Sequence, residues 1–171
     1  MVKIMKYYIN SFLIYSVLGF IMETTIKLLF SPSMNNGILY GPWVPIYGFG
    51  CCLIIVIMRF VFNRIKVNRF FKICLVFLLS MIILTLIEFI GGNLIELLTG
   101  KVFWDYKDLK YNYGHYIALE ISLIWGVMSL VIIYLIKPLI DKFIKKIPSI
   151  LTYLVLMLFL IDCVITTIMK V

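Results

Sequence analysis

Five long apolar stretches constrain this chain more than any other feature of its sequence. Charged or turn-rich segments separate these stretches, which cover residues 7–30, 44–62, 71–98, 116–136 and 147–169. The hydrocarbon layer of a membrane is ~30 Å thick and a helix rises ~1.5 Å per residue, so about 20 apolar residues can cross it. The sequence therefore predicts an all-α integral membrane protein, in which about five transmembrane helices form a single polytopic domain over residues 1–171.

The composition excludes the soluble classes of protein. Hydrophobic residues make up 64% of the chain and charged residues only 14%, whereas a soluble domain is about 45–50% apolar and about 25% charged. A chain this short cannot bury that excess, because it must also cover its own surface with polar groups. A soluble globular enzyme, a disordered chain and a disulfide scaffold are therefore excluded. The four cysteines show no zinc or haem spacing, so we predict no metal and no cofactor.

The basic residues predict how the helices cross the membrane. The chain has 16 Lys and Arg against 8 Asp and Glu, a net charge of +8, which in a soluble protein would indicate nucleic acid. In a membrane protein, Lys and Arg collect in cytoplasmic loops instead. Eleven of the 16 fall on the side of the N-terminus, namely Lys3, Lys6, Arg59, Arg64, Lys66, Arg69, Lys72, Lys137, Lys142, Lys145 and Lys146. This excess places the N-terminus in the cytoplasm and the C-terminus outside, with no nucleic-acid partner.

The acidic residues follow the opposite pattern. With this topology only Asp141 is cytoplasmic. The other seven acids lie in the outer half of the membrane or in the outer loop, and they are Glu23, Glu88, Glu96, Asp105, Asp108, Glu120 and Asp162. Ionisable groups inside a membrane are costly and normally face a cavity, a partner or a pathway, so this distribution requires an explanation.

Two helices carry their acids on a stripe of polar and small residues. At ~100° per residue, one narrow face of the third helix carries Thr85, Glu88, Gly92, Glu96 and Thr99. A similar face of the first helix carries Ser16, Gly19, Glu23 and Lys27. We therefore expect these helices to face each other around an outward-facing acidic cavity. The alternative is that the stripes only pack helices together, but Glu88 favours function because it is deep and has no basic neighbour in the sequence.

A segment rich in glycine and proline, residues 35–50, precedes the second helix. It contains Gly41, Pro42, Pro45, Tyr47 and Gly48, and it cannot be a regular helix throughout. Broken backbone at membrane depth is tolerated where it is buried in protein or lines a cavity. These residues are therefore predicted to form a structural loop, re-entrant or capping, over the acidic cavity. The alternative is an ordinary interfacial loop whose aromatic side chains lie at the membrane surface.

The outer loop between the third and fourth helices carries a further aromatic and polar group. Trp104, Asp105 and Tyr106 are consecutive, and Asn112 follows shortly before His115. We predict that Trp104, Asp105 and Tyr106 form the rim of the cavity and that Asn112 contributes to the same site. The alternative is that the aromatic residues only anchor the loop at the interface. His115 is expected to be an interfacial side chain and not a metal ligand, because no ligand spacing accompanies it.

These motifs occur in an order that is typical of a known family. In sequence order they are Tyr15 to Thr24, Gly37 to Gly50, Glu88, Glu96, Trp104 to Tyr106, Asn112, Gly114, Trp125 and Gly126. The chain resembles, over about residues 7–130, the bacterial membrane proteins named putative ABC transporter type IV, also called CmpB-like permeases. The resemblance implies a permease-like component in a bacterial plasma membrane that works with an ATPase subunit.

The expected function combines the resemblance with the distribution of acids. It is a membrane permease-like component of a transport system whose outward-facing acidic cavity binds a cationic or polyhydroxyl ligand. The predicted binding residues are Glu23, Glu88, Glu96, Trp104, Asp105, Tyr106 and Asn112. Two alternatives stay open, namely a membrane-embedded enzyme acting on lipid or cell-wall precursors at the outer leaflet, and a non-catalytic assembly subunit.

The predicted partners follow from what the sequence contains. The chain has no P-loop, dinucleotide fingerprint or metalloprotease motif, so no catalytic residue is predicted and enzymatic activity stays an open question. A nucleotide-driven step would need an ATPase or another membrane subunit. The remaining expected partners are the lipid bilayer and a second copy of the chain.

The topology is testable with single engineered cysteines after the native cysteines are removed. We expect a thiol at Lys66 to be shielded from impermeant reagents in intact cells, and a thiol at Lys107 to be labelled, because the two positions lie on opposite sides of the membrane. Labelling at Lys66 with protection at Lys107 would contradict the predicted orientation.

Overall fold

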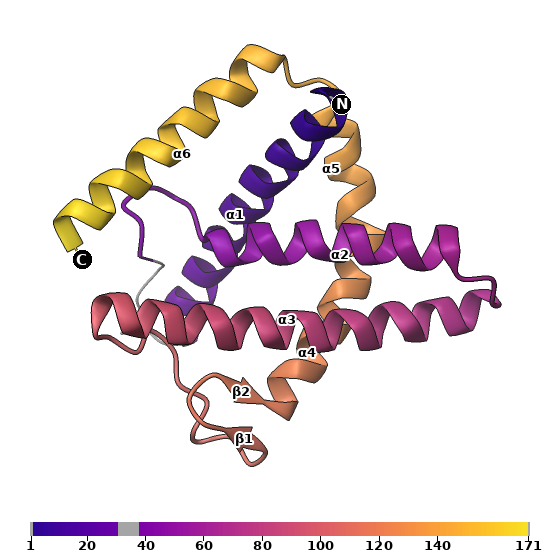
Figure 1. Ribbon diagram of the computed structural model, residues 1–171, viewed down its shortest axis with the longest axis horizontal. Coiled ribbons are helices and arrows are strands. Elements are labelled where there is room, and N and C mark those ends of the chain that lie inside the picture. The colour runs from indigo at the N-terminus through magenta and orange to yellow at the C-terminus, as the bar shows by residue number, and fades with distance from the viewer. Residues whose placement is uncertain (1, 31–37, 171) are drawn as a thin grey trace. The chain divides into compact units, whose positions relative to one another are not determined.

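The computed structural model describes residues 2–30 and 38–170 and is almost entirely helical (Figure 1). Its elements are α1 (Val2–Phe30), α2 (Pro45–Arg64), α3 (Arg69–Thr99), β1 (Asn112–Tyr113), β2 (Ile117–Ala118), α4 (Leu119–Val131), the π-helix η1 (Ile132–Ile136), α5 (Lys137–Ile144) and α6 (Ser149–Lys170). Since α4, η1 and α5 are continuous, the described part of the chain has five helices long and apolar enough to cross a membrane. The predicted all-α membrane fold is confirmed.

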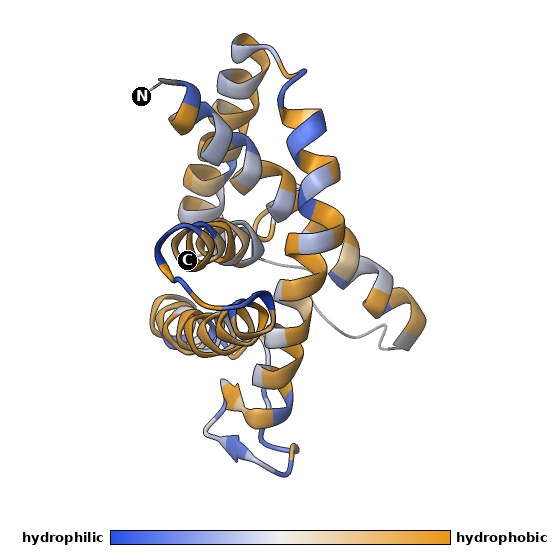
Figure 2. Ribbon diagram, turned by 90° about the vertical axis from the view of Figure 1, so that its right-hand side faces the viewer, coloured by the Kyte–Doolittle hydropathy of each residue, from blue (hydrophilic) through white to orange (hydrophobic). Residues whose placement is uncertain are grey.

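The surfaces of these helices are apolar, as expected for helices that face lipid (Figure 2). Leu97 is 82% exposed and Leu28 is 77% exposed, and many other large apolar side chains are exposed on every long helix. A soluble monomer rarely exposes apolar patches larger than a few hundred Å². Apolar side chains in contact with lipid tails, in contrast, cost no free energy, because the tails are as apolar as the side chains.

Local sequence signals account for several helix ends. The Asn68 side chain accepts a hydrogen bond from the Phe71 N–H at 2.9 Å and caps the start of α3. Gly100 ends α3 in the left-handed conformation, with φ of 66°, that favours glycine. Pro45 is the first residue of α2, a position where the missing N–H of proline has no cost.

The fourth helix differs from its predicted range, residues 116–136, at both ends. It begins at Leu119, because Tyr116 to Ala118 belong to a short antiparallel hairpin of β1 and β2 that turns at Gly114. It also continues beyond residue 136 through η1 and α5 to Ile144. Pro138 lacks the N–H that a regular helix would use, and the widened π-helix immediately before it accommodates this defect without ending the helix.

The chain divides into two compact units, which are described separately. The first unit is Met1–Cys52 with Ile140–Val171, and the second is Leu53–Leu139. In the first unit, polar contacts join α1 to α5, to α6 and to the turn between them. Asn10 and Thr152, both buried, exchange hydrogen bonds at 3.0 and 3.2 Å. Lys6 donates to the Ile147 carbonyl at 2.6 Å, and the Tyr7 hydroxyl donates to Asp141 at 2.8 Å.

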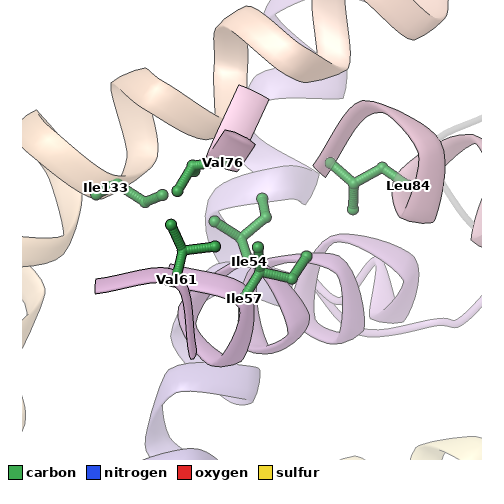
Figure 3. Packing of buried hydrophobic residues seen from close by; sticks show 6 residues of the cluster. All are labelled: Ile54, Ile57, Val61, Val76, Leu84 and Ile133. Carbon is green, nitrogen blue, oxygen red and sulfur yellow. The ribbon is translucent and has the colours of Figure 1, made fainter. Parts of the chain in front are cut away.

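The second unit is built on an apolar cluster that joins α2, α3 and η1. Figure 3 shows its six buried side chains pointing toward one another, namely Ile54, Ile57, Val61, Val76, Leu84 and Ile133. Close approach of α3 and α4 depends on Gly126, where an added Cβ would lie only 2.5 Å from the Phe77 ring. One turn away, the Thr85 hydroxyl donates to the Ser122 hydroxyl at 2.7 Å. This packing positions the polar face of α3 against α4.

Candidate functional site

A buried carboxylate on α3 is the centre of the polar site in the second unit. Glu88 has only 8% of its surface exposed. One of its oxygens accepts the Tyr106 hydroxyl at 2.5 Å, and the other accepts the indole N–H of Trp125 at 2.7 Å. Tyr106 comes from the loop between α3 and α4, residues 100–118, and Trp125 comes from α4. Both donors are neutral, and Glu88 has no ion-pair partner in the described part of the chain.

A second carboxylate lies two turns along the same face of α3. Glu96 accepts the Tyr116 hydroxyl at 2.9 Å. The Tyr116 ring passes over Gly92, where an added Cβ would lie 2.5 Å from the ring, so this contact requires glycine. Trp104 packs edge-on against Tyr116 with ring centroids 5.4 Å apart. The two acids of α3 are therefore each bonded to a phenol, and aromatic rings cover the face between them.

The loop between α3 and α4 is closed by hydrogen bonds among its own residues. The His115 ring and the Asp105 carboxylate form a hydrogen-bonded pair at 2.8 Å, and the Tyr106 N–H donates to the His115 carbonyl at 2.8 Å. Asn112 donates to the carbonyls of Lys107 and Leu109 at 2.9 and 2.6 Å. The Asn112 amide is therefore used inside the loop, and this loop holds Tyr106 in place over Glu88.

Two groups of the loop have altered acidity. Although partial desolvation acts in the opposite direction, the Lys107 N–H and the His115 ring hold the pKa of Asp105 below its usual range. Burial and the neighbouring Glu96 carboxylate raise the pKa of Tyr116 to about 12. Tyr116 consequently remains protonated and able to donate at any physiological pH, and Asp105 remains charged.

In the first unit, the polar stripe of α1 packs against the start of α2. The Val44 N–H donates to the Ser16 carbonyl at 3.1 Å. An added Cβ at Gly19 would lie 2.4 Å from the Tyr47 ring, so glycine is required for Tyr47 to cross α1. The Tyr47 hydroxyl is thereby placed to hydrogen-bond Glu23, one turn beyond Gly19.

The broken segment, predicted over residues 35–50, ends earlier than expected, at Val44. Residues 38–44 are non-helical, whereas Pro45, Tyr47 and Gly48 lie in the first turns of α2, which corrects their assignment to a loop. Proline begins a helix without cost, and Gly48 serves close packing, since an added Cβ would lie 2.3 Å from the Ser16 hydroxyl. Of the remaining predicted loop positions, Gly41 and Pro42 are in the non-helical part. Asn35, Asn36 and Gly37 lie outside the described residues.

An acid on α6 anchors this non-helical segment. Asp162 accepts the N–H groups of Tyr40 and Gly41 at 3.1 and 2.8 Å, and the Thr166 hydroxyl at 3.2 Å. Trp43 packs edge-on against Phe159 of the same helix. A shallow groove of about 620 Å³ runs between the segment and α6, and Asp162 is the acidic residue in its otherwise mainly apolar lining. Asp162 is not among the binding residues predicted from the sequence.

The structure divides the predicted site residues between the two units. Glu88, Glu96, Trp104, Asp105, Tyr106 and Asn112 belong to the second unit, and Glu23 belongs to the first. Each predicted stripe has its own partners inside its own unit, and the apposition of the two stripes stays a prediction. Sequence analysis missed Trp125, Tyr116 and His115 as contacts of the acidic residues. No signal in the sequence points to Tyr116, because tertiary packing decides which ring lies against Gly92.

The fold and the polar groups within its helices define a multi-pass helical membrane protein. The chain belongs to the family described as Putative ABC-transporter type IV, whose family model matches residues 10–168. This confirms the resemblance seen in the sequence and makes the chain a membrane component of the ABC-transporter type. Membership of this family implies that the protein is embedded in the bilayer, and it is compatible with partner subunits. No curated protein and no solved structure matches the chain.

The acidity of Asp105 predicts how the loop between α3 and α4 responds to pH. Because the folded pKa of Asp105 is depressed, its contribution to loop stability is present above the unfolded value of about 4 and is lost as pH falls through the folded value. We expect hydrogen-exchange protection of the Tyr106 amide to be constant near neutral pH and to fall in strong acid, after correction for intrinsic exchange. The Asp105→Asn variant should lose this acid-dependent step. An unchanged acid step in that variant would contradict the assignment.

Proposed function

We propose that this protein is the membrane component of a transport system in a bacterial plasma membrane, and that it binds a cationic ligand at an outward-facing acidic site. Glu88 and Glu96 supply the negative charge in the second unit. Trp104 and Tyr106 form the aromatic rim. The N-terminus is proposed to be cytoplasmic and the C-terminus external.

The burial of the Glu88 carboxyl group without a cationic partner among the described residues is the observation that carries this proposal. A carboxylate buried in a membrane helix needs compensation, either from a cation or from hydrogen bonds to the charged form. Glu88 receives two hydrogen bonds, but both come from neutral groups and the described chain supplies no cation. Each carboxylate oxygen can accept a further hydrogen bond. A bound cation would supply the missing charge and use this remaining capacity.

The surroundings of the two acids favour an organic cation. Glu88 and Glu96 are eight residues apart on one helix face, which places them ~12 Å apart along the axis. Trp104, Tyr106 and Tyr116 lie at these acids and present aromatic rings. Aromatic faces attract ammonium and guanidinium groups, and carboxylates also accept hydrogen bonds from hydroxyl groups. A ligand that carries an amine, with or without hydroxyl groups, therefore fits this lining.

The same spacing argues against a hydrolytic enzyme at this site. Carboxyl groups that act together on one glycosidic bond are typically about 5–10 Å apart. Glu88 and Glu96 are farther apart along the helix, and a separate phenol binds each of them. The arrangement favours binding of one ligand by both carboxylates over acid–base catalysis at a single bond.

The first unit contributes a further acidic position and the segment before α2. Glu23 is paired with Tyr47 there, and Gly41 and Pro42 shape the segment that Asp162 holds. We propose that Glu23 also belongs to the outer acidic surface of the protein. Since the sequence contains no nucleotide-binding motif, an ATPase subunit is the proposed source of energy for transport.

Removing the charge of Glu88 tests the proposed site. In the Glu88→Gln variant the side chain keeps its size and can still accept one of its two hydrogen bonds. We expect binding of alkylammonium compounds to weaken on the order of ten- to a hundredfold, because a hydrogen bond to a charged group contributes about 1.5–3 kcal/mol. Ligand-induced thermal stabilisation of the purified full chain, measured with an amine panel and a neutral polyol panel, provides the readout.

Asp108→Asn is the matched control, because Asp108 is an exposed acid of the same outer loop. The control should bind the amine panel as the wild type does. Wild-type binding by the Glu88→Gln variant would return Glu88 to a role in helix packing. Selective stabilisation by polyols would favour the polyhydroxyl ligand over the cation.

A further inference from the structure

Two buried hydroxyl groups on α1 have no hydrogen-bond partner within the described residues. They belong to Ser11, which is 0% exposed, and Tyr15, which is 3% exposed. Serine and threonine in a helix usually donate to the carbonyl four residues earlier, as Ser16 and Thr24 do on this same helix, both at 2.8 Å. The Ser11 hydroxyl does not make this bond, so its hydrogen-bonding capacity is available to another group.

The geometry of a helix brings the two hydroxyl groups to one place. Ser11 and Tyr15 are four residues apart and therefore lie one above the other on one face. Long side chains on a helix point toward its N-terminus, so the Tyr15 hydroxyl lies over the turn that contains Ser11. Leaving a buried polar group unsatisfied costs about 1–3 kcal/mol. One water molecule, which makes 2–4 hydrogen bonds in typical buried sites, would satisfy both.

The same face continues to a polar contact one turn earlier. Tyr7 precedes Ser11 by four residues, and its hydroxyl donates to Asp141 of α5 at 2.8 Å. Tyr7, Ser11 and Tyr15 therefore follow one another at four-residue spacing along one face of α1, and Asp141 accepts the hydroxyl of the first of them.

We propose that Ser11 and Tyr15 bind an internal water molecule, and that this water extends the Tyr7–Asp141 hydrogen bond into a chain of hydroxyl groups along the N-terminal half of α1. Every hydroxyl group in such a chain both donates and accepts. The chain would be a polar path in the half of α1 remote from Glu23, and it does not depend on the ligand at Glu88.

Water-edited solid-state NMR of the full chain in lipid bilayers tests this proposal directly. In the wild type we expect rapid transfer of magnetisation from water to the Tyr15 ring. In Ser11→Ala this transfer should be at least about twofold weaker, because the water loses one of its 2–4 partners. Ser129→Ala is the matched control, since Ser129 is equally buried but donates to the Gly126 carbonyl at 2.7 Å. That variant should leave the transfer unchanged.

A third variant tests the connection to Asp141. Tyr7→Phe should slow the transfer to Tyr15 by removing the link between the internal water and the end of the helix, whereas Tyr153→Phe, an exposed tyrosine of α6, should not. Absence of transfer in the wild type would overturn the proposal. Equal transfer in the wild type and Ser11→Ala would also overturn it, and this outcome does not depend on how well Tyr7→Phe folds.

Discussion

A polar group that faces the hydrocarbon of a bilayer finds no water there and must be satisfied inside the protein, and this constraint decides how both units of the chain are built. In the first unit the buried amide of Asn10 exchanges hydrogen bonds with Thr152, and Asp162 accepts the backbone N–H groups of Tyr40 and Gly41. In the second unit, Thr85 bonds Ser122 across α3 and α4. Apolar side chains gain little by leaving lipid for protein, so these few polar contacts, with close packing at glycine, select which helices associate.

Glu88 meets the same constraint only in part, and this is why we propose a function for it. Tyr106 and Trp125 satisfy its two oxygens, but neither group cancels a negative charge. The two hydrogen-bond donors also lie on different kinds of element. Trp125 is fixed on α4, whereas Tyr106 sits on a loop that Asp105, Asn112 and surrounding backbone groups hold closed. A ligand could displace the loop residue without disturbing the packing of α3 on α4.

The sequence predicts the parts of this structure that follow from periodicity. Hydropathy located the five helices, and the 3.6-residue period placed Glu88, Gly92 and Glu96 on one face. Periodicity does not say what a face meets, so the donors to Glu88, which lie 18 and 37 residues away, could not be predicted. The strands of the hairpin before α4 have two residues each, which is too short to show an alternating hydropathy pattern. The π-helix before Pro138 could not be predicted either, because it depends on how the helix backbone adjusts to the proline.

A structure of the full chain purified from its native membrane, with whatever ligand accompanies it, tests the central claim most directly. The account predicts density for a positively charged group within hydrogen-bonding distance of the Glu88 carboxylate, between the rings of the outer loop and α4. Glu88 bonded only to Tyr106 and Trp125, with density for a ligand elsewhere, would contradict it.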